Sequence, residues 1–327
     1  MNKEMQFFNW VIVVALMVGL LAGVSWAEYP DRPITLIGIW GAGGSSDMSS
    51  RALVIFAEKK LGQPFVITYK PGAAGSLGVG AVAAAKPDGY TIGAVTFSPL
   101  TTSPHMFDVP YNPLTDFQYI MGYGKYMYGA CVRADSPFKT LKDLIDYAKA
   151  NPGKIKYSHA GNATPNNFGM IYLAKATGVK WEGIVYKTAP EYTAACLGGH
   201  VDVVSPNPID VVQYIKAGRL RLLVSFCDNR WEWVPEVPTA LELGYNINLV
   251  SWYALGAPKG VPKPIMEKLR TVFTEAVKDA EFLEIMKRFY APVVFRTGDE
   301  FKKLVEEGYR ENEKMIFELG LHKSQKK

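Results

Sequence analysis

The chain has 327 residues, of which 48% are hydrophobic and 20% charged, and its formal net charge is +5 at pH 7. The basic residues are spread along the chain, which argues against a nucleic-acid-binding surface and agrees with a mild attraction for small anions. The length allows two domains.

The first 27 residues are typical of an export signal. Lys3 precedes an apolar run over residues 11–24, and Ser25 and Ala27 are the small residues expected before a cleavage site. The run is short for a membrane span, so an uncleaved anchor is the weaker alternative. We expect a soluble periplasmic protein that is cleaved after Ala27.

Three cysteines, Cys131, Cys196 and Cys227, are an odd number in an exported chain, so at least one has no partner within it. Each lies in an apolar stretch. We expect them to be small buried residues.

A glycine-rich turn follows the first expected strand. Residues 34–40 are rich in β-branched and aromatic side chains, residues 41–44 read Gly-Ala-Gly-Gly, and a helix begins near residues 45–47 and ends at Gly62. Ser45, Ser46 and Asp47 are candidate N-caps, and we expect Asp47 to cap the helix instead of contacting a ligand. Because a helix N-terminus presents free N–H groups and a positive dipole end, the turn predicts an anion site.

The next segment repeats this plan. A strand over residues 65–69, a turn over residues 71–75, a helix over residues 76–85 and a strand over residues 91–95 predict a parallel α/β sheet. Both glycine turns then open at the same sheet edge, where such folds bind ligands.

The second half predicts another parallel sheet with its own row of polar loops. It starts with a strand near residues 126–132 and a helix over residues 141–150, opened by Thr140 and Asp143 as a capping box. Further strands are expected at 155–158, 184–187, 201–205 and 220–226.

The remaining segment lacks a third set of strand-loop-helix units. It contains strands over residues 247–255 and 292–295, two helices over 265–278 and 281–289, and a last helix opened by Thr297 and Glu300. We expect it to return to the first domain. The predicted fold class is therefore α/β, with two parallel-rich sheets in two lobes (28–131 with 252–327, and 132–251) and a ligand cleft between them.

The glycine turns also match, in part, the sequence patterns of nucleotide-binding sites and of serine hydrolases. A dinucleotide fingerprint needs glycine where Ser46 stands, and a P-loop needs a lysine that is missing, so nucleotide binding is not expected. Residues 74–78 resemble the nucleophile elbow of a serine hydrolase, with Ser76 as nucleophile and His159 or His200 as base. Helix capping by Ser76 is the favoured reading.

The four histidines, His105, His159, His200 and His322, show no paired metal-ligand spacing, and no cysteine or carboxylate cluster completes a site, so we expect no metal and no cofactor. His159 on a cleft loop either bonds a carboxylate or is a surface residue. Lys187 either pairs with a second acidic group or is solvated, and Asn207 borders another cleft loop. Trp40 either stacks on a ligand or closes the core.

Several short motifs along the mature chain resemble one family. They include Gly43-Gly44-x-x-Asp47, Pro71-Gly72-Ala73-x-Gly75, Pro87-Asp88-Gly89-Tyr90-Thr91, Leu197-Gly198-Gly199-x-Val201-Asp202 and Val237-Pro238-Thr239. Together they resemble the Bug-type receptors of tripartite tricarboxylate transporters. The resemblance implies a type II periplasmic binding-protein fold that closes on a small organic acid, without catalysis, and delivers it to a permease with a large and a small subunit.

The resemblance also implies a ligand site. Backbone amides of Trp40, Gly41, Ala42, Gly43, Gly44, Ala73, Ala74 and Gly75 would hold a carboxylate, and His159, Ala160, Gly161, Thr164, Asn167, Lys187 and Asn207 would face it from the second lobe. Gly41-Ala42 stands where the family has proline, and Trp40 replaces a phenylalanine, so the ligand can differ. We expect a monomer. A sensor that presents its ligand to a membrane kinase is the alternative role.

Overall fold

The structure is a computed structural model that describes residues 29–325. The expected signal peptide and its cleavage site lie outside these residues. Among the helices described, none has the length and apolar character needed to cross a bilayer.

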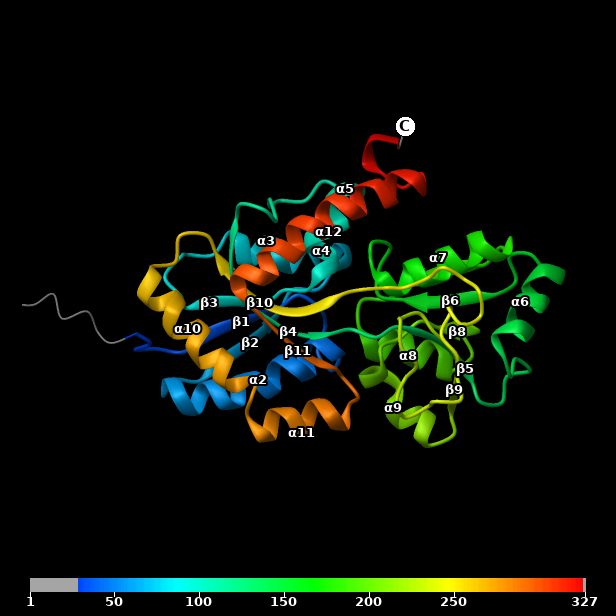
Figure 1. Cartoon of the computed structure of the whole chain (residues 1–327), viewed down its shortest axis with the longest axis horizontal. Coiled ribbons are helices and arrows are strands. Elements are labelled where there is room, and N and C mark those ends of the chain that lie inside the picture. Colours follow the sequence, from blue (N-terminus) through cyan, green and yellow to red (C-terminus); the bar gives the residue numbers. More distant parts are fainter. Residues whose placement is uncertain (1–28, 326–327) are drawn as a thin grey trace, which may run out of the picture.

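The first lobe contains a six-stranded mixed sheet (Figure 1), in the order β11-β4-β10-β3-β1-β2. β1 pairs in parallel with β2 and β3, whereas β10 runs antiparallel to β3 and β4, and β11 antiparallel to β4. The strands are β1 (Ile34–Gly38), β2 (Phe65–Tyr69), β3 (Thr91–Ala94), β4 (Phe117–Lys125), β10 (Trp252–Pro258) and β11 (Val293–Thr297).

Helices cover both faces of this sheet because β1 alternates its side chains between two cores. Leu36 packs with Leu53 of α2, and Ile37 packs with Val79 of α3. One face carries α2 (Ser45–Leu61), α10 (Lys263–Ala276) and α11 (Ala280–Arg288). The other face carries α3 (Ser76–Ala83), α4 (Phe97–Thr101), α5 (Ser103–Met106) and α12 (Gly298–Glu318), and a short turn, η2 (Lys323–Gln325), follows α12.

The second sheet has the order β7-β6-β8-β5-β9 and is also mixed. β6 pairs in parallel with β7 and β8, but β5 runs antiparallel to β8 and β9. The second sheet, predicted from the sequence as a parallel domain, is thus mixed, because β5 enters directly from the first sheet and runs opposite to β8 and β9. Its elements are β5 (Gly129–Arg133), α6 (Leu141–Ala150), β6 (Lys156–His159), α7 (Pro165–Thr177), β7 (Glu182–Val185), α8 (Ala189–Leu197), β8 (Val203–Val204), α9 (Pro208–Lys216) and β9 (Leu220–Ser225).

Two crossings join the sheets, and they run side by side. They leave the first sheet at a paired position, Lys125 opposite Trp252. The amide of Tyr126 donates to the carbonyl of Ser251 at 3.0 Å, and the Tyr126 ring stacks on Tyr253 with centroids 3.7 Å apart.

The helix N-caps that depend on residues three apart in the sequence were predicted correctly for α6 and α12. Both expected capping boxes form: Asp143 N donates to Thr140 Oγ1 at 3.2 Å, and Glu300 N donates to Thr297 Oγ1 at 3.2 Å. The three cysteines are buried, as expected, and all three are free.

Candidate functional site

A cavity opens between the glycine turn after β1 and the loops of the second sheet. It encloses about 530 Å³ of atom-free space, including its mouth. We call it the inner cavity. Residues of both sheets and of both crossings line it: Trp40, Gly41, Gly44, Ser45, Ser46, Thr96, Ser98, Tyr126, Tyr128, Ala160, Thr164, Pro165, Asn166, Lys187, Thr188, Ala189, Tyr192, Asn207 and Ser251.

The wall from the first lobe is mainly backbone. Gly43 has a φ of 78°, a conformation that glycine adopts without strain, and its amide donates to Asp47 Oδ2 at 2.8 Å. Among the described residues, the amides of Gly41, Gly44 and Ser46 donate to no protein acceptor. The helix N-terminus therefore offers donors toward the cavity.

The cap of this helix differs from the prediction. The N-cap is Gly44, and no side chain of Ser45, Ser46 or Asp47 caps it. Asp47 instead secures the turn through Gly43, and its other oxygen accepts from Tyr69 Oη at 2.7 Å and from Arg51 Nε at 2.9 Å. Its charge is thereby held inside the protein and away from the cavity, as expected of a structural residue.

An acid of the second lobe reaches the same turn. The Ser45 amide donates to Asp210 Oδ1 at 3.1 Å, and Tyr192 Oη and the Asn207 amide donate to Asp210 Oδ2. Burial raises the pKa of Asp210, although these hydrogen bonds favour its charged form. The sequence analysis missed Asp210. Its position three residues after Asn207, where a capping box places an acid, was the available signal.

The two lobes approach closely at the glycine turn. A Cβ added to Gly41 would lie 2.2 Å from Thr188 Cγ2, and one added to Gly44 would lie 3.2 Å from Ala189 Cβ. Glycine at position 41 is thus required by proximity and not by its backbone angles. Gly41 belongs to the pair Gly41-Ala42, which stands where the family resemblance implied a proline.

The second turn, residues 73–75, lines a neighbouring space, which we call the outer cavity. Ala73 and Ala74 line it, together with Gly161 and Asn162 across from them. Ala73 and Ala74 have φ values of 47° and 52°, which side chains other than glycine rarely adopt. Gly75 does not line either cavity; it packs under the Trp40 ring.

Trp40 separates the two cavities. Its ring lines both of them, and its Nε1 donates to Thr96 Oγ1 at 3.1 Å. The indole is therefore fixed in place as a wall. Ala160 and Lys187 also border both cavities, whereas Ala42 and Gly43 are exposed at the rim of the turn.

The second-lobe loop divides into lining and supporting residues. Ala160 and Thr164 line the inner cavity and Gly161 the outer one, but His159 and Asn167 are buried beneath the loop and line neither. Asn167 Oδ1 accepts from Tyr157 Oη at 2.7 Å, and its Nδ2 donates to Asn162 O at 2.9 Å. The neighbouring Asn166, and not Asn167, lines the inner cavity.

The placement of His159 corrects the expectation that it lies on the cleft surface. Its Nδ1 accepts from the Gly161 amide at 3.2 Å, and burial lowers its pKa to about 4. The ring is therefore neutral at pH 7 and holds the loop from below.

Asn207 does line the inner cavity, and it brings an unsatisfied acceptor. Its Nδ2 donates to Asp210 Oδ2 at 3.1 Å, while its Oδ1 is buried with no hydrogen-bond partner among the described residues. An unpaired buried carbonyl is costly, which favours a ligand donor at this point.

Aromatic residues of the crossings and of α8 complete the cavity, and the sequence analysis missed them. Tyr126 and Tyr128 lie on the first crossing and Tyr192 on α8. The signal was present, since two tyrosines spaced by two residues share one side of an extended segment that must pass the cleft floor.

Ser76 lies apart from both cavities. It is buried, does not cap its helix, and its Oγ accepts from Tyr111 Oη at 3.1 Å. His159 is buried in the other lobe and His200 is exposed, so the geometry for nucleophilic attack is not assembled among these residues.

Comparison with known proteins gives a consistent assignment. Residues 50–321 match the model of the tripartite tricarboxylate transporter family receptor. The chain is 37% identical over 298 residues to the "UPF0065 protein in gbd 5'region" of Cupriavidus necator, covering 91% of this chain and 90% of that one.

Solved structures agree. The periplasmic binding protein BugD has a TM-score of 0.86 at 29% identity, covering 90% of this chain and 99% of its own. MatC of Rhodopseudomonas palustris, with bound malate, has a TM-score of 0.83 at 25% identity, covering 88% and 100%. R. palustris Rpa4515, with adipate, has a TM-score of 0.84 at 25% identity, covering 90% and 99%.

The expected two-lobed binding-protein fold is therefore confirmed, and the family is one of binding proteins, not enzymes. This chain belongs to the tripartite tricarboxylate transporter receptor family, the Bug-type periplasmic solute-binding proteins.

Proposed function

We propose that this protein binds a small organic carboxylate in the inner cavity and delivers it to a tripartite tricarboxylate-type permease with a large and a small membrane subunit. The observation that carries the proposal is the set of uncommitted amides of Gly41, Gly44 and Ser46 at a helix N-terminus that faces the cavity. Two relatives of the same fold hold malate and adipate, both carboxylates.

The cavity suggests how the ligand is held. The amides of the first wall fix one carboxylate, and the exposed ammonium of Lys187 pairs with a second acidic group. Asn207 Oδ1 accepts a hydrogen bond from a hydroxyl, amino or protonated acid group. The tyrosines and Trp40 cover the apolar part of the ligand.

The mechanism we propose is closure of the lobes, with residues 28–131 and 252–327 moving against residues 132–251. Closure brings Gly41 onto Thr188 and the Ser45 amide onto Asp210. It removes water from the ligand, and preformed donors cost little to organise. The exported protein, cleaved after Ala27, works in the periplasm as a monomer.

A thermal-shift screen tests the proposal. The protein is unfolded and refolded to remove any co-purified ligand, and mono-, di- and tricarboxylic acids are added. A ligand at about 100 times its Kd adds about 2.7 kcal/mol of apparent stability, which raises the melting temperature by several degrees. If no carboxylate shifts the melting temperature, carboxylate binding is refuted.

A transport assay separates delivery from binding. A tripartite tricarboxylate-type permease with a large and a small subunit is reconstituted with the receptor, and uptake of the acid found in the screen is measured. We expect uptake only when the receptor is present. Binding without any receptor-dependent uptake would favour the sensor role.

A further inference from the structure

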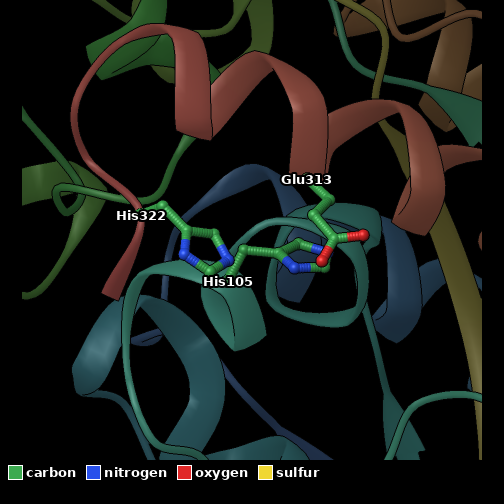
Figure 2. A group of neighbouring side chains, drawn as sticks. All are labelled: His105, Glu313 and His322. Atoms are coloured by element: carbon green, nitrogen blue, oxygen red, sulfur yellow. The ribbon is translucent and has the colours of Figure 1, made fainter. Parts of the chain in front are cut away.

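Three side chains of types that can bind a metal ion, His105, Glu313 and His322, lie together on the first lobe, away from both cavities (Figure 2). His105 lies in α5, Glu313 lies in α12, and His322 follows the end of α12. One ligand atom from each residue lies within 4.8 Å of the others. Linear spacing could not reveal this group, because His105 and Glu313 are 208 positions apart in the sequence.

His105 is oriented as a ligand would be. The ring is buried, packs on Tyr309 with centroids 4.2 Å apart, and its Nε2 lies 2.9 Å from the Tyr309 carbonyl oxygen. A carbonyl only accepts, so Nε2 carries the hydrogen and Nδ1 keeps its lone pair in the neutral ring.

His322 is held in a comparable way on the exposed side. Its ring lies 6.1 Å from that of His105 with 30° between the planes, and its Nδ1 is 2.7 Å from Ser324 Oγ. The Ser324 amide donates to Nδ1 at 3.2 Å, so in this structure Nδ1 accepts and Nε2 carries the ring hydrogen. A cation at Nε2 requires the other tautomer, in which Nδ1 gives up the amide contact and donates to Ser324 Oγ, the outer-shell arrangement usual for metal-bound histidine.

The surrounding charges are mixed. Lys323 opposes positive charge at His105, although its Nζ is paired with Asp108 Oδ1 at 3.1 Å, whereas the Glu313 carboxylate favours positive charge there and lies beside the His105 ring in Figure 2. The scaffold is also fixed, because Asn312 Nδ2 donates to Thr101 Oγ1 at 2.9 Å and to Thr102 Oγ1 at 3.1 Å.

We propose that His105 Nδ1, His322 Nε2 and the Glu313 carboxylate bind one divalent transition-metal ion, of which Zn²⁺ is the reference probe. Two imidazole nitrogens and one carboxylate suit Zn²⁺ and its neighbours Co²⁺, Ni²⁺ and Cu²⁺, and leave one position for water. Bonds of 2.0–2.2 Å in a tetrahedron place ligand atoms about 3.3 Å apart. Glu313 and His322, on the outer surface, close the remaining gap.

The ion would join α5, α12 and the segment after α12, and so fix the end of the chain to the first lobe. This role is independent of the ligand in the inner cavity, because none of the three residues lines it.

Titration calorimetry with Zn²⁺ tests the site on the tag-free mature protein after removal of metals with a chelator. We expect one Zn²⁺ per chain. His322→Ala and Glu313→Gln should each weaken binding at least tenfold, and because His322 is half-buried and Glu313 exposed, neither change touches a fully buried side chain. His200→Ala, an exposed histidine of the other lobe, is the matched control and should bind as the wild type does.

The outcomes are decisive in both directions. The proposal is overturned if the wild type binds no Zn²⁺, if either His322→Ala or Glu313→Gln keeps the wild-type affinity, or if His200→Ala weakens binding as strongly. A Zn²⁺-dependent rise in melting temperature that the wild type and His200→Ala show, and His322→Ala lacks, supports a metal that links the terminal segment to the lobe.

Discussion

The two walls of the inner cavity present different chemical groups to a ligand. The first-lobe wall presents the backbone amides of Gly41, Gly44 and Ser46 at the start of α2, and the second-lobe wall presents the side chains of Thr164, Asn166, Lys187 and Asn207. Backbone donors recognise any carboxylate, whereas side chains recognise what else the ligand carries. In the function proposed above, the first wall binds the carboxylate and the second wall selects among ligands that carry one.

The largest expected effect concerns the support of the second wall. His159 is buried with a pKa near 4, so between pH 6.5 and pH 4 the unfolded chain binds a proton that the folded chain does not. Its contribution to stability is complete above pH 6.5 and is lost as the pH falls toward 4, by about 3 kcal/mol. Denaturant unfolding at pH 7 and pH 4 should show this loss in the wild type and not in His159→Gln.

His200→Gln serves as the control, because His200 is exposed. An identical pH dependence in the wild type and His159→Gln would show that His159 is accessible to solvent. It would then lie at the cavity surface and not beneath the loop.

The second-largest expected effect concerns the close contact between Gly41 of the first wall and Thr188 of the second lobe. Gly41→Ala places a methyl group against Thr188, and we expect a loss of about 2 kcal/mol in the binding of the best carboxylate, or about 30-fold in Kd. Calorimetry measures it. The double variant Gly41→Ala/Thr188→Gly should recover most of the affinity, and an unchanged Kd in Gly41→Ala would mean that these loops do not meet in the complex.

A smaller effect separates the roles of the two walls. Lys187→Met should weaken binding of a dicarboxylate by about 1 kcal/mol, roughly fivefold, because an exposed charge pair is screened by solvent. A monocarboxylate of the same length should bind unchanged. Lys149→Met, on the outside of α6, is the control, and an equal loss for both acids would remove Lys187 from the recognition of a second group.

The smallest effect concerns the outer turn. Ala73 is exposed in a left-handed conformation, so Ala73→Gly should raise the free energy of unfolding by about 0.5 kcal/mol. Ala81→Gly, inside α3, should lower it by about 1 kcal/mol. A lower stability in Ala73→Gly would indicate that the turn adopts another conformation.

The first wall could be predicted from the sequence, because strand, glycine turn and helix are encoded by neighbouring residues. The second wall could be predicted only as a set of loops. Whether His159 or Ala160, and Asn166 or Asn167, faces the cavity depends on how each strand end and helix start is rotated in the packed lobe. The contact of Ser45 with Asp210 joins residues 165 positions apart, and no local pattern specifies it.

The paired crossings have a mechanical consequence. Tyr126 and Ser251 are joined by a hydrogen bond, and the strands that lead into them are adjacent in one ladder. Such a narrow ribbon bends and twists more easily than its two strands slide past each other, since sliding would break the ladder bonds. We expect the two lobes to rotate about one axis that passes through the crossings. The Tyr126–Tyr253 stack, and not the cavity itself, then sets the resistance to this rotation.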